Sequence, residues 1–167
     1  MIESIAEISK NQKIIFNNEF IDKIIVDIEA ANNLEIKSSL KDLHAADIAE
    51  LLEFLSTSQR TYLLNQLDSE DYTDVLAELD DSIIDQTVNS LQHEKVAKSI
   101  SDMETDDAVG LIESLEPDTQ KKILDKVSAE DREIFNESLN YPEDTAGRRM
   151  QKEIVSMPSF WTVGQAI

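Results

Sequence analysis

A twelve-residue pattern of apolar side chains runs through the chain from residue 43 to residue 139. One apolar residue recurs at each twelfth position, at Leu43, Leu55, Leu67, Leu79, Leu91, Met103, Leu115, Val127 and Leu139. A mostly apolar pair, such as Leu51 and Leu52, follows eight and nine residues after each of them, and Ile48 precedes this pair. Since positions i, i+3, i+4 and i+7 share one face of a helix, each repeat predicts one short amphipathic helix, here with Leu55 as its last apolar residue.

Residue types that cap helices follow the repeated apolar positions. Ser56 and Gln59 have the spacing of a capping box, and Pro117 suits a first helical turn. A helix of about nine residues is roughly 15 Å long and is too short to be stable alone in water. The pattern therefore predicts an all-α fold, a right-handed superhelical α-solenoid of about ten short helices with a twelve-residue repeat. A globular bundle fits less well, because its helices are normally longer and unequal.

The two ends of the chain do not keep the repeat, which divides the sequence into three parts. Residues 1–42 predict N-terminal helices that cap the solenoid, with a helical stripe over 20–28 and a short helix over 34–43. Residues 43–140 form the helical-repeat domain. After Leu139 the pair Tyr141 and Pro142 breaks the helix, and residues 141–167 are interpreted as a linker and the truncated opening of a second domain.

Acidic side chains outnumber basic ones by 35 to 15, which gives a formal net charge of -20. Nucleic acid is therefore a poor partner. Between Thr61 and Glu94 the sequence contains no Lys or Arg but many carboxylates, and such a surface repels itself and attracts cations. Composition alone favours a solvated outer face, and cation binding is the alternative.

Enzymatic chemistry has little support in the sequence. The chain has no cysteine, so it has neither a disulfide framework nor a thiolate site. The two histidines, His44 and His93, lie far apart in the sequence at predicted helix starts. With three glycines in the chain there is no phosphate-binding loop, and no serine has the setting of a nucleophile elbow. We predict that the protein is not an enzyme, and no membrane span or signal peptide is predicted.

Three runs of residues resemble the MgtE family of magnesium transporters: 43–52 (LHAADIAELL), 106–109 (DDAV) and 143–150 (EDTAGRRM). The last run and the segment 161–167 (WTVGQAI) are similar to the join between the N domain of that family and its first CBS domain. The resemblance implies that residues 43–140 are an MgtE N domain and that 141–167 open a CBS domain. The repeats also resemble the solenoid of the flagellar motor switch protein, and a structural protein-interaction solenoid is the alternative function.

The resemblance implies a cytosolic, Mg²⁺-sensing regulatory domain on the cytoplasmic face of the cell membrane. In that family Mg²⁺ bridges the acidic N domain to CBS domains of the same homodimeric transporter and keeps the pore of its transmembrane domain closed. By position, the Mg²⁺ ligands of the family fall on Asp74 and Asp106. Gly110 stands where the family has a further acid, so Asp107 or Asp102 is the candidate that compensates. Because Mg²⁺ retains several waters, no tight ligand spacing marks such sites.

Overall fold

The structure, a computed structural model, describes residues 17–152 and residue 162, and every element in them is a helix. The helices are α1 (Asn18–Glu29), α2 (Asn33–Leu40), α3 (Ala45–Glu53), α4 (Thr57–Leu64), α5 (Ser69–Ala77), α6 (Asp81–Ser90), α7 (His93–Asp102), α8 (Thr105–Glu113), α9 (Pro117–Leu124) and α10 (Ala129–Leu139). They contain between 8 and 12 residues each. The all-α class and the short helices are therefore confirmed.

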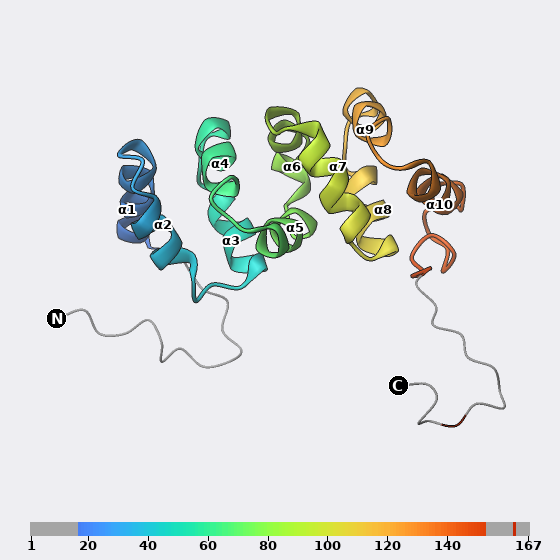
Figure 1. The fold of residues 1–167 in the computed structure, drawn as a ribbon, viewed down its shortest axis with the longest axis horizontal. Coiled ribbons are helices and arrows are strands. Elements are labelled where there is room, and N and C mark those ends of the chain that lie inside the picture. Colours follow the sequence, from blue (N-terminus) through green and yellow to red (C-terminus); the bar gives the residue numbers. More distant parts are fainter. Residues whose placement is uncertain (1–16, 153–161, 163–167) are drawn as a thin grey trace.

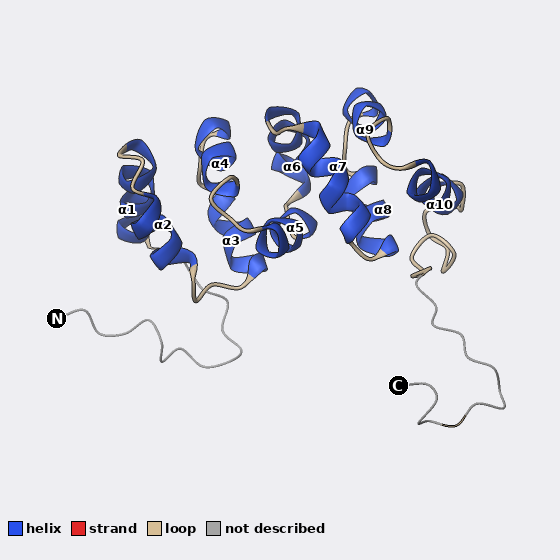
Figure 2. Ribbon diagram, viewed as in Figure 1, coloured by secondary structure: helices blue, strands red, loops and turns tan. Residues whose placement is uncertain are grey.

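The helices follow one another along the long axis of the molecule, from α1 and α2 at one end to α10 at the other (Figure 1). From α3 onward the helices pack mainly on the second helix along the chain: α3 on α5, α4 on α6, α5 on α7, α7 on α9, and α8 on α10, whereas α1 and α2 pack on each other. Contacts with the third helix join α1 to α4, α5 to α8, and α6 to α9. Short loops connect the successive helices (Figure 2). This is stacking of short helices, as the repeat predicts, while the right-handed superhelical twist stays a prediction.

The paired apolar positions form a core that extends along the stack. Their side chains have no exposed surface at Leu51, Leu52, Leu63, Leu64, Val75, Leu76, Val88, Ile100, Ile112 and Ile123. Full burial of one such side chain contributes about 1.5–3 kcal/mol. The register of these pairs is therefore confirmed, and each helix alone would leave its pair in water.

The position that recurs every twelve residues lies outside most of the helices, where the sequence predicted the last apolar residue of each helical face. Leu55 follows α3 by two residues, and Leu91 is the C-cap of α6. These side chains still pack on the core: Leu55, Leu79, Leu91, Leu115 and Val127 are buried, and Leu43, Leu67, Met103 and Leu139 are partly buried. Helices commonly end in this way, because an apolar residue after the C-cap packs back on the last turn.

Three polar side chains, Arg60, Gln120 and Arg132, occupy a position that is apolar in other repeats, such as Ile48. The Nε of Arg60 donates a hydrogen bond to the backbone oxygen of Leu52 at 2.9 Å. The Nε2 of Gln120 donates to the backbone oxygen of Ile112 at 3.2 Å. Each bond adds a second donor to a carbonyl near the end of the preceding helix, beside the backbone N–H of Leu55 or Leu115.

Local capping follows the sequence closely. The backbone N–H of Ser56 donates to Oε1 of Gln59 at 2.9 Å, and Pro117 is the first residue of α9. The carboxylate of Asp68 accepts hydrogen bonds from the backbone N–H groups of Glu70 and Asp71. Some acidic residues of the stretch without Lys or Arg are therefore helix caps.

The ends of the chain are described in part. Helices α1 and α2 correspond to the two predicted N-terminal helices, although α2 ends at Leu40 and not at residue 43. Residues 141–152 form turns after α10, in agreement with the predicted helix break. Residues 1–16, 153–161 and 163–167 lie outside the described residues, and with them most of the predicted CBS opening.

Candidate metal site

Two carboxylates of the acidic stretch join α6 to the turn between α8 and α9. Oδ1 of Asp81, on α6, accepts a hydrogen bond from Oγ of Ser114 at 2.6 Å. Oδ1 of Asp85, one helical turn further on, accepts from the backbone N–H of Glu116 at 3.0 Å. These two acids hold the turn between α8 and α9 against α6, so their role is structural.

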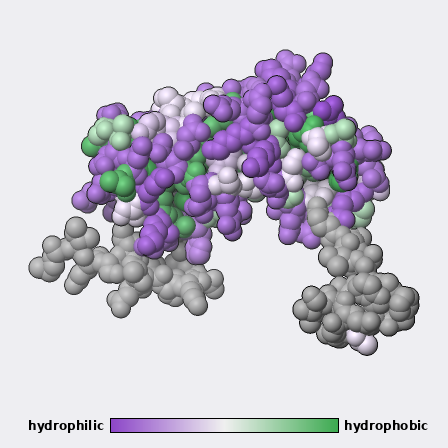
Figure 3. Space-filling view, in the orientation of Figure 1, coloured by the Kyte–Doolittle hydropathy of each residue, from purple (hydrophilic) through white to green (hydrophobic). Residues whose placement is uncertain are grey.

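Asp74 lies on α5 and its side chain is exposed. Within residues 17–152 the structure gives it neither a hydrogen bond nor an ion pair. Glu70, Asp71 and Glu78 are exposed on or beside the same helix. Hydrophilic side chains cover most of the face of the molecule shown in Figure 3. The carboxylate of Asp74 is therefore available to a cation or to another surface.

Three carboxylates meet at the N-terminus of α8, and we call them the α8 cluster: Glu104, Asp106 and Asp107. One ligand oxygen from each lies within 4.8 Å of the others. Glu104 is the N-cap of α8, and the two aspartates lie in its first turn, where the helix dipole favours negative charge. Glu104 and Asp107 are exposed, whereas Asp106 is partly buried.

The negative charge of the α8 cluster is only partly compensated by hydrogen bonds. Oδ1 of Asp106 is buried and has no hydrogen-bond partner among the described residues. Burial, and the neighbouring charge of Asp106, raise the pKa of Asp107. Glu104 accepts a hydrogen bond from Nε2 of Gln151, after the last helix. Three carboxylate oxygens at this separation can hold one hard cation, which would offset their repulsion.

The structure brings two of the three predicted ligands together and leaves the third apart. Asp106 and Asp107 share the α8 cluster, and Asp74 does not belong to it. Helix α5, which carries Asp74, nevertheless packs on α8, the third helix further along the chain. Glu104 was missed as a ligand because its position before a helix indicated only a cap. Its spacing from the two aspartates at one helix start was the available signal.

Gly110 is not required by close packing of α8. A Cβ atom at this position would have no neighbouring atom within 4 Å apart from its own helix. A Cβ atom is therefore tolerated there. The carboxylates of the α8 cluster are Glu104, Asp106 and Asp107, without a further acid at position 110.

The sequence profile described as the MgtE intracellular N domain matches residues 43–144. The chain belongs to the MgtE N domain family. A comparison with curated proteins gave no match. The family match favours a transporter domain over the alternative of a motor-switch-like solenoid.

Two solved structures resemble this MgtE N domain in fold. One is the crystal structure of the soluble part of a magnesium transporter, with 23% identity and a TM-score of 0.75 over 89% of this chain and 59% of that chain. The other is the cytosolic domain of the Mg²⁺ channel MgtE in complex with ATP, with 17% identity and a TM-score of 0.66 over 76% of this chain and 52% of that chain. The chain thus spans little more than half of either protein. None of the described helices has the length and hydropathy of a membrane span.

Replacing Asp107 by asparagine is expected to raise the melting temperature of this MgtE N domain near pH 7. The pKa of Asp107 is raised in the folded state, so folding binds its proton more tightly and stability falls as pH rises through that pKa. The Asn variant does not titrate, so its stability does not fall in this pH range for this reason. Because the site is partly solvated, we expect a gain of less than about 3 °C. The gain should shrink as pH is lowered toward the ordinary carboxyl range.

Thermal unfolding near pH 7 and at a pH in the ordinary carboxyl range measures this effect. The control is Asp118→Asn. Asp118 is an exposed acid in the first turn of α9 and lies outside the α8 cluster. Its loss removes a favourable interaction with the helix dipole and should not stabilise the domain. Equal shifts in both variants would show that Asp107 responds to the overall negative charge and not to the cluster.

Proposed function

We propose that this domain senses Mg²⁺ for an MgtE-type magnesium transporter on the cytoplasmic face of the cell membrane. It regulates the pore by Mg²⁺-bridged association with the CBS domains of the same transporter. The observation that supports this most directly is the α8 cluster, with its buried, unpaired oxygen on Asp106. The resemblance to the soluble part of a magnesium transporter supports the same assignment.

The chemistry of Mg²⁺ explains why the domain binds the ion as half of a site. Mg²⁺ prefers oxygen ligands, keeps several waters and usually takes one or two carboxylates from a protein surface. Asp106 and Asp107 supply these from α8, and Asp74 supplies a second contact from α5. An opposing acidic face contributes the remaining ligands. Alone, the domain should bind Mg²⁺ with roughly millimolar affinity, governed mostly by its negative field and weakened by salt.

Electrostatic repulsion supplies the switch. The domain has a formal net charge of -20, and its acids also line a groove between α3 and the start of α6, formed by Asp47, Glu50, Glu53, Glu78 and Asp80 beside Ala46. Two acidic faces repel each other unless cations lie between them. At high Mg²⁺ the N and CBS domains associate and the pore closes, and at low Mg²⁺ they separate. The domain acts as part of a homodimer, binds no nucleic acid and catalyses no reaction.

The test uses the full-length transporter with Asp74 and Asp106 both replaced by asparagine. Protease protection of the linker between N and CBS domains is followed during a Mg²⁺ titration. We expect the double variant to need about tenfold more Mg²⁺ for protection, a typical loss when groups of a metal site are changed. Circular dichroism should show that the domain stays folded, because Asp74 is exposed and Asp106 lies in a first turn.

The matched control is the double variant Asp118→Asn and Glu130→Gln. It removes the same charge from exposed first-turn positions of α9 and α10. It should become protected at nearly the Mg²⁺ concentration of the parent. If the Asp74 and Asp106 variant also behaves like the parent, these residues are ordinary surface acids and the site assignment is wrong. If protease protection of the linker in the parent does not depend on the Mg²⁺ concentration, the sensing role itself is contradicted.

A further inference from the structure

The segment Tyr141–Lys152, which leaves the last helix, folds into compact turns. The backbone N–H and Oγ1 of Thr145 donate hydrogen bonds to the backbone oxygen of Pro142 at 3.1 and 2.7 Å. The N–H of Arg148 donates to the oxygen of Thr145 at 3.1 Å. A Cβ atom on Gly147 would lie 2.7 Å from the ring of Tyr141, so the turn closes tightly against that ring.

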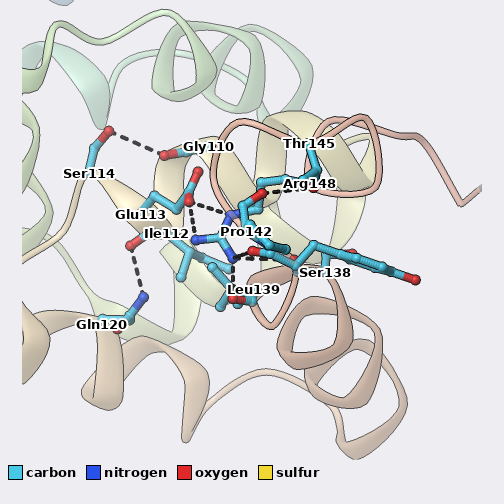
Figure 4. A network of polar contacts seen from close by, with 11 residues as sticks. Gly110, Ile112, Glu113, Ser114, Gln120, Ser138, Leu139, Pro142, Thr145 and Arg148 are labelled. Carbon is cyan, nitrogen blue, oxygen red and sulfur yellow. Dashed lines mark hydrogen bonds and ion pairs between the residues drawn. The ribbon is translucent and has the colours of Figure 1, made fainter.

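The side chain of Arg148 joins this segment to two helices (Figure 4). It is only 8% exposed, and its Nε donates to Oε1 of Glu113, the last residue of α8, at 2.5 Å. The Nη2 group forms an ion pair with the same carboxylate. The Nη1 group donates to the backbone oxygens of Ser138 at 3.3 Å, of Tyr141 at 3.2 Å, and of Leu139. The guanidinium of Arg148 thus binds the carboxylate at the end of α8 and the carbonyls at the end of α10 at the same time.

The segment also contacts the other end of α8. Nε2 of Gln151 donates to Glu104, the N-cap of α8. Nζ of Lys152 lies 3.1 Å from Oε1 of Glu137 on α10 and 5.6 Å from the centre of the Tyr141 ring. The chain after α10 therefore runs along α8 from its last residue to its first, with a contact at each end.

We propose that Tyr141–Lys152 is a strap whose latch is Arg148, which fixes the outgoing chain to α8 and α10 so that the three move as one body. The carbonyls at the end of α10 have no partner within the helix, and the carboxylate of Glu113 is mostly buried, with 23% exposure. Removal of the guanidinium takes the arginine donor away from the carboxylate of Glu113 and from the backbone oxygen of Leu139 at once, while the oxygen of Ser138 keeps its bond from the N–H of Tyr141. Opening of the latch frees the outgoing chain, while the core from α1 to α9 stays packed. This inference is independent of cation binding.

Hydrogen exchange on the whole chain tests the latch. In the variant Arg148→Gln we expect the amides of residues 148 and 149, which bond to the oxygens of Thr145 and Ala146, to exchange about 100-fold faster. Amides of α3 to α6 should exchange at the parental rate. Arg149→Gln removes the same charge from an exposed neighbour and should leave the strap protected. Glu113→Gln, which keeps an acceptor for Arg148, should accelerate exchange by a smaller factor.

A distance measurement gives a second readout, because the chain has no cysteine of its own. Spin labels on Lys98→Cys in α7 and Met150→Cys in the strap, both at exposed positions, should report one narrow distance in the parent and in Arg149→Gln. The distribution should broaden in Arg148→Gln. Equal exchange and equal distributions in the two arginine variants would overturn the proposal. Faster exchange throughout α3 to α6 in Arg148→Gln would also overturn it, since Arg148 would then belong to the core and not to a separable strap.

Discussion

Replacing Leu76 by alanine is expected to lower the free energy of unfolding by about 2–5 kcal/mol. Leu76 has no exposed surface and lies on α5, which packs on α3, α7 and α8. The loss consists of the transfer free energy of the deleted carbons and the cost of the cavity that remains. Because α5 is held by three helices, its backbone is not free to move and fill the cavity. Urea unfolding monitored by circular dichroism measures the change.

Leu34→Ala is the matched control for this prediction. Leu34 is 83% exposed near the start of α2, so its truncation creates no cavity. We expect a change within about 0.5 kcal/mol. The same urea midpoint for both leucine variants would contradict the core register and, with it, the stacking of the repeats.

Replacing Arg60 by alanine is expected to lower the free energy of unfolding by about 3 kcal/mol. The side chain of Arg60 is only 7% exposed and lies between α3 and α6, where it also reaches Oε1 of Gln86 at 3.4 Å. Alanine removes the packed aliphatic stem and the charged donor to the carbonyl of Leu52, which keeps only its bond from the backbone N–H of Leu55. A hydrogen bond from a charged group contributes about 1.5–3 kcal/mol. Chemical denaturation of the purified domain measures the sum.

Two further variants separate packing from hydrogen bonding at this position. Arg60→Leu restores the apolar type of the other repeats but supplies no donor to Leu52, so it should lose less stability than Arg60→Ala. Arg149→Ala truncates an exposed arginine and should have little effect. If Arg60→Ala is as stable as Arg149→Ala, the bond to Leu52 does not contribute to the stack.

The helices were predictable because their signals are local. The paired apolar positions depend on the helical period alone, and the cap at Ser56 depends on a residue three positions away. The prediction for Leu55 was wrong, because it placed this residue in the last turn of a helix, whereas Leu55 lies two residues after the end of α3. An apolar residue that packs from the loop after a C-cap has the same spacing as one within the helix, so periodicity cannot separate the two.

The candidate site was predictable only where its residues are neighbours in sequence. Asp106 and Asp107 share a helix start, and the structure adds Glu104 to them. Asp81 and Asp85 looked like any other surface acids of an acidic stretch. Their partners, Ser114 and Glu116, are about thirty residues away, and no local pattern indicates such a contact.

The sequence by itself determined that the chain forms short helices, which of their faces are apolar and that they must stack. These properties follow from the period of the apolar residues and from the free energy of burying them, which belongs to each side chain wherever its neighbours come from. The tertiary structure alone decided that the helices from α3 onward pack mainly on the second helix along, that Arg60 donates to Leu52, and that Arg148 holds α8 and α10 together. Hydrogen bonds and ion pairs are directional and short in range, so the value of a polar residue depends on which distant atom the fold brings within about 3 Å of it.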